Sequence, residues 1–158
     1  MNLKKLIFIS VLFCALFTIL PALPNELLEQ PLQQDPAILS GQLPNGFTYY
    51  IQHNPNPSHL AELRLYVDAG SVDEDDDQRG LAHFTEHMVF NGTKNFAKSE
   101  LVNYLSSIGM GYANGLNGMT SYDYTIYTFK IPTDDKEKLN KGLMILSDMA
   151  YQATFDPA

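Results

Sequence analysis

The pattern of hydrophobic and polar positions predicts strands and helices in mixed order between residues 45 and 158. Residues 47–52 are aromatic and β-favouring, and residues 62–67 alternate polar and apolar side chains, so both segments are expected to be strands. The turn residues Asn54-Pro55-Asn56-Pro57 lie between them, and we expect the two strands to form a hairpin. A further long strand is expected over residues 120–131, which are rich in Tyr, Thr, Ile and Phe.

Three other segments carry apolar residues at helical spacing and are expected to be helices. The first covers residues 80–90 and the second covers residues 98–108. The third is opened by Asp134 with Glu137 three residues later, which is a capping box, and runs to about Tyr151. The apolar faces of the second and third helices are expected to be Leu101, Val102, Leu105 and Ile108, and Leu139, Leu143, Leu146 and Ala150. These elements predict an α+β fold, in which a mixed, largely antiparallel sheet is covered by helices.

The first 44 residues differ in pattern from the rest of the chain. Lys4 and Lys5 precede an apolar run over residues 6–20, which predicts a secretory signal peptide over residues 1–22. The run is shorter than the roughly twenty residues that span a bilayer, so an uncleaved anchor is the alternative and would be the only membrane contact. Residues 23–44 are rich in proline and are expected to be an extended leader with little regular structure. We therefore expect an exported protein, either periplasmic or secreted, and the resemblance described below implies a Gram-negative bacterium as its source.

The net charge of the chain limits the kinds of molecule that it is expected to bind. The chain has 18 Asp and Glu against 10 Lys and Arg, a formal net charge of -8. An acidic chain is repelled by a phosphate backbone, so nucleic acid is not an expected partner. The acidic residues gather in the block Asp73–Asp77, which we interpret as a solvated loop. A calcium site is the alternative, although the spacing does not match an EF-hand loop.

The pentad His83-Phe84-Thr85-Glu86-His87 carries the candidate chemistry. On a helix each residue turns by about 100°, so His83 and His87 share a face and Glu86 lies beside them. Imidazoles are zinc ligands, a catalytic zinc keeps a position open for water, and a nearby glutamate can take the proton of that water. A solvated histidine pair, or a pair that caps a neighbouring element, is the alternative. The spacing predicts a Zn²⁺ site with His83 and His87 as ligands and Glu86 as the general base.

Four motifs extend this pattern along the chain: Ala69–Ser71, Gly80–Met88, Phe90–Thr93 and Asn117–Asp123. In order and spacing they resemble the pitrilysin/insulinase family of inverted zinc metallopeptidases, and most of all its exported bacterial members. The resemblance covers roughly residues 40–158 and implies that residues 45–158 are the first part of an N-terminal metallopeptidase domain. One departure is Gly118, which stands where the family usually has alanine.

The same resemblance implies a site that needs further chain. The family's third zinc ligand is a glutamate that would fall at about position 163, so residues 45–158 are expected to be a partial domain, truncated before that ligand. Active members pair two or four such domains around a closed chamber. Further homologous domains, in the same or another chain, are therefore expected partners. A peptide or unfolded polypeptide is the expected substrate, bound as an added strand near Asn117.

Two functions of different class follow from these observations. The first is a zinc metalloendopeptidase, or the N-terminal fragment of one, that hydrolyses peptide bonds with a zinc-bound water activated by Glu86. The second is a non-catalytic peptide-binding or assembly module of the same fold, inactive because the third ligand is lacking. The intact pentad favours the first function, and the missing ligand favours the second for these 158 residues alone.

Overall fold

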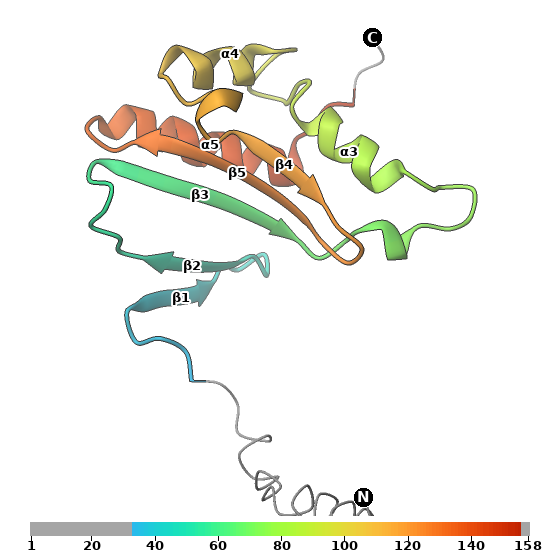
Figure 1. Ribbon diagram of the computed structural model, residues 1–158, viewed down its shortest axis with the longest axis horizontal. Coiled ribbons are helices and arrows are strands. Elements are labelled where there is room, and N and C mark those ends of the chain that lie inside the picture. The colour runs from blue at the N-terminus through green and yellow to red at the C-terminus, as the bar shows by residue number, and fades with distance from the viewer. Residues whose placement is uncertain (1–32, 156–158) are drawn as a thin grey trace, which may run out of the picture. The chain divides into compact units, whose positions relative to one another are not determined.

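Figure 1 shows the computed structural model of the chain, which describes residues 33–155. The signal peptide predicted over residues 1–22 lies outside the described residues. The chain divides into two compact units, residues 1–53 and residues 54–158, and each is described separately. No helix between residues 33 and 155 is both long enough and apolar enough to cross a membrane.

The first unit contains an antiparallel hairpin. Strands β1 (Ile38–Gln42) and β2 (Thr48–Gln52) pair with Ile38 opposite Gln52. Leu43 donates its N–H to the carbonyl of Phe47 at 2.8 Å, and Gly46 has a φ of +89°, so Pro44-Asn45-Gly46 forms the turn between the strands. The stretch that we expected to have little regular structure therefore contains a strand, because this turn folds the chain back onto the residues before it.

The second unit is built on a three-stranded antiparallel sheet. Its strand order is β3 (Leu60–Val67), β5 (Thr125–Pro132) and β4 (Asn117–Thr120), with β5 in the centre. The predicted hairpin between residues 47–52 and 62–67 is wrong, since β2 pairs with β1 and β3 pairs with β5. β3 pairs with β5 because both strands present alternate apolar side chains to the same buried face.

The long strand predicted over residues 120–131 is confirmed as β5 over residues 125–131, but its predicted start is wrong, because Thr120 ends β4 and a turn follows it. Ser121 donates its N–H to the carbonyl of Tyr124 at 2.8 Å, which closes a tight hairpin between β4 and β5. Serine and aspartate at 121 and 123 favour a turn, and their effect outweighs the β propensity of the flanking residues.

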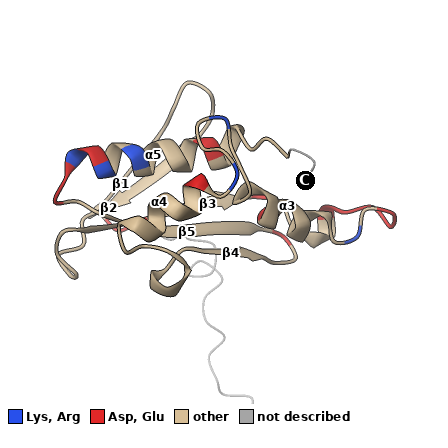
Figure 2. Cartoon of the chain, turned by 90° about the horizontal axis from the view of Figure 1, so that it is seen from above, with Lys and Arg blue, Asp and Glu red and all other residues tan. Residues whose placement is uncertain are grey.

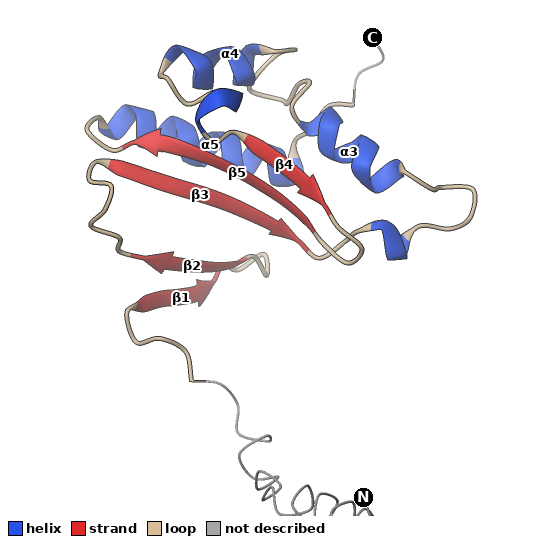
Figure 3. Cartoon of the chain, in the orientation of Figure 1, coloured by secondary structure: helices blue, strands red, loops and turns tan. Residues whose placement is uncertain are grey.

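Helices cover one face of this sheet, as Figure 3 shows. Helix α3 (Leu81–Val89) packs against β4, and α5 (Lys136–Tyr151) packs against β3 and β5. Helix α4 (Glu100–Ser107) buries Leu101 and Leu105, as its pattern predicts. The buried residues of β5 lie under these helices, and they are Thr125, Tyr127, Phe129 and Ile131. The prediction of an α+β fold with an antiparallel sheet covered by helices is confirmed.

The start of α5 differs from the prediction by one residue. Asp135, and not Asp134, is the N-cap, and its carboxylate accepts the N–H of Glu137 at 2.8 Å. Asp134 instead contacts Lys138 on the first turn, with Nζ and Oδ1 3.3 Å apart. Aspartate is a preferred N-cap residue at either position, but the capping box pointed to Asp134, because Lys138 and not a glutamate stands three residues after Asp135.

The buried face of α5 also differs from the prediction. Gly142, Ile145, Asp148 and Met149 are its buried residues, whereas Leu143 is 49% exposed. Gly142 explains the shift, because a Cβ atom there would lie 2.5 Å from the Ile131 side chain. The helix therefore approaches the sheet through a glycine, and the leucines are turned to the sides and to solvent.

Candidate metal centre

Helix α3 brings the two histidines of the pentad together. The Nε2 atoms of His83 and His87 are 3.1 Å apart, and both side chains are exposed. Two nitrogens that each lie about 2.0–2.1 Å from a tetrahedral zinc are about 3.3 Å from one another, so the pair fits a zinc position. One neutral ring can also donate its N–H to the other. Within residues 33–155 no group of three His, Cys, Asp or Glu side chains could hold a metal ion.

Glu86 points from the same helix onto β4. Its side chain is buried, with 6% exposed, and Oε2 accepts a hydrogen bond of 2.8 Å from the Thr120 hydroxyl. The carboxylate lies directly over Gly118, where a Cβ atom would overlap Oε1. The glutamate is thus held between its helix and the sheet, beside the two imidazoles.

The negative charge of Glu86 contributes to the raised pKa values of two nearby tyrosines. Burial raises the pKa of the Tyr127 phenol to about 12, and the nearby Glu86 charge adds to the shift. The pKa of Tyr112 is raised for the same two reasons, with burial the larger. Both rings pack edge-on against Phe90, at centroid distances of 5.8 and 6.1 Å. Glu86 therefore lies near two tyrosines, of which Tyr127 is buried and Tyr112 is largely exposed.

Asn117, the predicted substrate-binding residue, is exposed at the start of β4. Successive side chains of a strand alternate between its faces, so Asn117 points away from the face that carries Gly118 and Thr120. It lies opposite Thr128 of β5. The structure therefore brings the rings of His83 and His87 together, holds Glu86 of the same helix against β4, and places Asn117 on that strand but on its other face.

Sequence reasoning missed Thr120 and Tyr127 as neighbours of the pentad. Both fall in segments that the β pattern identified, but a single predicted strand over residues 120–131 assigned them no common partner. The alternation of β5 from Thr125 onward could have placed Tyr127 on the buried face. Tyr127 comes near Glu86 because β4 and β5 form a hairpin, and a single continuous strand over residues 120–131 leaves no place for that hairpin.

The acidic block holds the N-terminal end of α3. Glu74 accepts the N–H of Gly80 and that of Ala82, each at 2.8 Å. These two hydrogen bonds, that of Ala82 first, lower the pKa of the Glu74 carboxyl. Gly80 itself has a φ of +94° and carries no capping side chain, so Glu74 takes the place of an N-cap residue. The interpretation of the whole block as solvated loop is wrong for Glu74.

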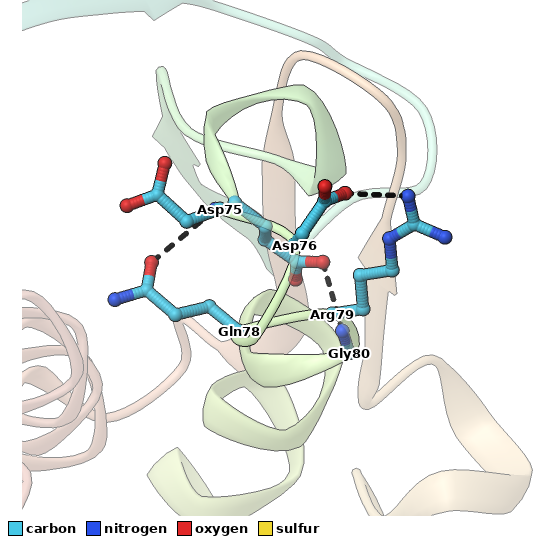
Figure 4. Close-up of polar contacts among 6 residues, drawn as sticks. Asp75, Asp76, Gln78, Arg79 and Gly80 are labelled. Atoms are coloured by element: carbon cyan, nitrogen blue, oxygen red, sulfur yellow. Dashed lines mark hydrogen bonds and ion pairs between the residues drawn. The ribbon is translucent and has the colours of Figure 1, made fainter.

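The rest of this block makes short-range polar contacts (Figure 4). Asp76 forms an exposed ion pair with Arg79 at 2.6 Å, and the Gln78 side chain accepts the N–H of Asp75. Seen from above in Figure 2, these acidic residues lie on the extended loop that leads into α3. These contacts are exposed and stay within the loop, whereas Glu74 is directed at the helix.

The C-terminal end of α3 is held by a buried carboxylate of α5. Asp148 is 2% exposed and accepts the Thr93 hydroxyl at 2.7 Å. The same carboxylate accepts the backbone and side-chain N–H groups of Asn95, at 3.1 and 2.9 Å. Lys94 adds a backbone hydrogen bond to Gln152 at 2.9 Å. The loop that follows the pentad helix is therefore fixed to α5.

A groove of about 380 Å³ opens beside His83. Its walls include Thr120, Ser121 and Tyr122 from the β4–β5 hairpin, together with Ser71 from the loop after β3. A second groove, of about 330 Å³, lies between α4 and α5 and shares no residue with the pentad. The groove beside His83 is the one from which a bound molecule would reach the candidate metal centre.

Comparisons with known proteins agree on one family. Residues 49–158 match the family described as Insulinase (Peptidase family M16). The "Probable zinc protease PqqL" of Haemophilus influenzae is 34% identical over 149 residues, and the match covers 94% of this chain and 16% of that protein. The protein of the same name from Escherichia coli is 37% identical over 145 residues, covering 90% and 16%.

Solved structures give the same relationship. The crystal structure of the first half of the periplasmic protease PqqL from Escherichia coli is similar, with a TM-score of 0.76 and 37% identity. The similarity covers 80% of this chain and 27% of that one. The chain thus spans only 16% of the length of the curated relatives that it matches first.

Proposed function

We propose that this chain, which belongs to the insulinase family of peptidases (peptidase family M16), supplies two metal ligands and the general base of a zinc metalloendopeptidase. The observation that carries the proposal is the pair of Nε2 atoms 3.1 Å apart with the buried carboxylate of Glu86 beside them. His83 and His87 would hold zinc. The remaining protein ligand would be an acidic residue outside residues 33–155.

Each residue of the pentad would have a separate task. Zinc, when bound, lowers the pKa of a water towards 7 and polarises a carbonyl group. Glu86 would accept the proton of the attacking water and pass it to the leaving nitrogen of the peptide bond. The packing of Glu86 against β4, which leaves it 6% exposed, would shield this carboxylate from bulk water.

The substrate would be a peptide or an unfolded polypeptide that binds as an added strand. β4 lies at the edge of its three-stranded sheet, and among residues 33–155 its strand partner is β5. Its free edge therefore offers backbone N–H and C=O groups to an extended chain. Asn117 would contact that chain at the start of the strand.

We also propose a cellular location and partners for the protein. The signal predicted over residues 1–22 supports export to the periplasm or secretion, and the similar Escherichia coli protein is described as periplasmic. Because the chain spans 16% of its relatives, further homologous domains in the same or another chain would complete the enzyme.

One observation favours a second function, a non-catalytic peptide-binding or assembly module. It is that residues 33–155 contain only part of a ligand set. In such a module Glu86 and the histidines would serve packing and polar contacts, and replacing them would leave peptide binding unchanged.

Measurements of zinc affinity and of the rate of peptide hydrolysis distinguish the two functions. Titration calorimetry with Zn²⁺ should show weaker binding in His83→Ala and His87→Ala than in the parent, whereas His53→Ala, which removes a histidine from the first unit, should bind normally. In the complete protein Glu86→Gln should retain zinc and lose peptide hydrolysis by about 10²–10⁴-fold. Equal zinc affinity in all four proteins would overturn the metal assignment, and full turnover by Glu86→Gln would overturn its role as base.

A further inference from the structure

We infer that Thr120 is the positioning residue of Glu86, whose carboxylate it holds in one orientation through a hydroxyl hydrogen bond. The inference rests on the proposed function, since it concerns how the general base is oriented. The two residues are 34 positions apart and meet only because α3 packs on β4. Thr120 also forms part of the wall of the groove beside His83, and its effect on the reaction is assigned to its hydrogen bond with Glu86.

The hydroxyl of Thr120 is a directed donor. Its Oγ1 lies 2.8 Å from Glu86 Oε2, at the last position of β4 and opposite Thr125 of β5. A threonine side chain has few χ1 rotamers on a strand, so the strand fixes the direction of its O–H group. Hydrogen bonds to an ionised carboxylate are short and strong, and this one fixes the position of Oε2 on β4.

Gly118 is the second residue of β4 that contributes to the position of the Glu86 carboxylate. It precedes Thr120 by two residues and so lies on the same face of β4. A Cβ atom on Gly118 would meet Glu86 Oε1 and would lie 2.8 Å from Cδ. The carboxylate therefore rests on bare backbone at one oxygen while the other oxygen is bound by the hydroxyl.

The hairpin that carries Thr120 is itself fixed at its turn. Ser71 and Val72 donate their N–H groups to the carbonyls of Ser121 and Tyr122, at 3.1 and 2.8 Å. The Thr125 hydroxyl donates to the carbonyl of Ala69 at 3.0 Å. The loop after β3 is thus hydrogen-bonded to the turn next to Thr120. These hydrogen bonds restrict movement of the Thr120 hydroxyl.

Loss of this donor would allow Glu86 to rotate within its site. A general base is effective only when it lies within reach of the proton that it accepts. We expect Thr120→Val to lower kcat by about 10- to 100-fold, the range for one hydrogen bond to a charged group. KM and zinc content should stay close to the parent values, because the histidines and the backbone edge of β4 are unchanged.

The test compares three substitutions of similar size. Thr120→Val removes the hydroxyl, Thr120→Ser restores it, and Thr128→Val makes the same change on β5, on the face away from α3. In the complete zinc-loaded protein, kcat, KM and zinc content are measured with a quenched fluorescent peptide. In the 158-residue chain, carbon-13 NMR follows the side-chain carboxyl resonance of Glu86, identified by its absence from Glu86→Gln.

The expected result is a lower kcat and a displaced carboxyl resonance in Thr120→Val alone, with both values recovered in Thr120→Ser. If Thr120→Val does not fold, Thr120→Ala serves in its place. A normal kcat, or an unmoved resonance, in a folded variant without the hydroxyl overturns the inference. If Glu86→Gln is fully active, the proposed function fails as well. If Glu86→Gln is inactive but Thr120→Val is fully active, only the role of Thr120 fails.

Discussion

The two ends of α3 are each held by a carboxylate, but in opposite surroundings. At the N-terminal end, Glu74 reaches back from a polar loop and binds two backbone N–H groups, at Gly80 and Ala82. At the C-terminal end, Asp148 reaches across from α5 and is buried with three donors from Thr93 and Asn95. The first contact is local in sequence, and the second joins residues 55 positions apart.

The difference shows which end of the pentad helix is tied to the global fold. The buried hydroxyl of Thr93 would be left without a partner and away from water if it lost its acceptor, which is costly, whereas Asn95 is exposed and its two N–H donors can turn to water. Two N–H groups at an open helix end can turn to solvent instead. His87 therefore lies nearer the end of α3 whose following loop is bound to α5. His83 lies nearer the end that is held by Glu74 of the preceding loop.

The largest expected effect comes from the buried end. Asp148→Ala should lower the free energy of unfolding by about 1–3 kcal/mol, mainly because the buried hydroxyl of Thr93 loses its acceptor, with a smaller part from the exposed Asn95. Urea denaturation followed by circular dichroism measures it. Asp148→Asn keeps one acceptor oxygen and should lose less, and an unchanged midpoint for Asp148→Ala would contradict the ranking of the two ends.

An intermediate and local effect is expected at the other end, and it should depend on pH. The lowered pKa of Glu74 means that its ionised form is stabilised in the folded chain. That stabilisation is fully present above its ordinary pKa of 4.5 and is lost as the pH falls through the lower folded value.

Amide hydrogen exchange measures this effect directly. Glu74→Gln should speed exchange at Gly80 and Ala82 at pH 6, with little change in α5, and the difference from the parent should vanish at pH values below the folded pKa. The same acceleration in α5 would show that the two ends are not separable.

The smallest effect is expected for the surface pair in the same loop. Asp76→Asn removes an exposed ion pair with Arg79, and such pairs are screened and contribute little. The thermal midpoint and the exchange rates of Gly80 and Ala82 should match those of the parent. A change as large as that of Glu74→Gln would mean that the loop, and not the Glu74 carboxylate alone, supports the helix end.

The sequence was sufficient for those parts that local spacing decides. The pentad helix, the paired imidazoles and the buried pair of Leu101 and Leu105 follow from a period of 3.6 residues. The pairing of β3 does not, because its partner lies beyond two helices while β2 is its neighbour in sequence. Adjacent strands with a turn between them favour a hairpin, and only packing of the apolar faces selects the distant partner.

The residues that orient the site were the hardest to predict. Asp148 has the same pattern as a solvated charge on a helix, and Thr120 that of an ordinary strand residue. Their roles depend on contacts with residues 55 and 34 positions away. Glu74 caps a helix from outside the usual N-cap position, because Gly80 adopts a left-handed conformation there. Such contacts follow from the assembled fold and carry no local signature.

The central place of β5 in its sheet also sets the timing of folding during synthesis. Val67 leaves the ribosome with β3 but pairs with Thr125, so about 58 residues are added before its partner exists, about 3–12 s at about 5–20 residues per second. Helices form in microseconds, so α3 and α4 can fluctuate as helices throughout that interval. The pentad lies inside the loop that the β3–β5 pairing closes. The candidate metal centre can therefore assemble only when the strand that follows it has emerged.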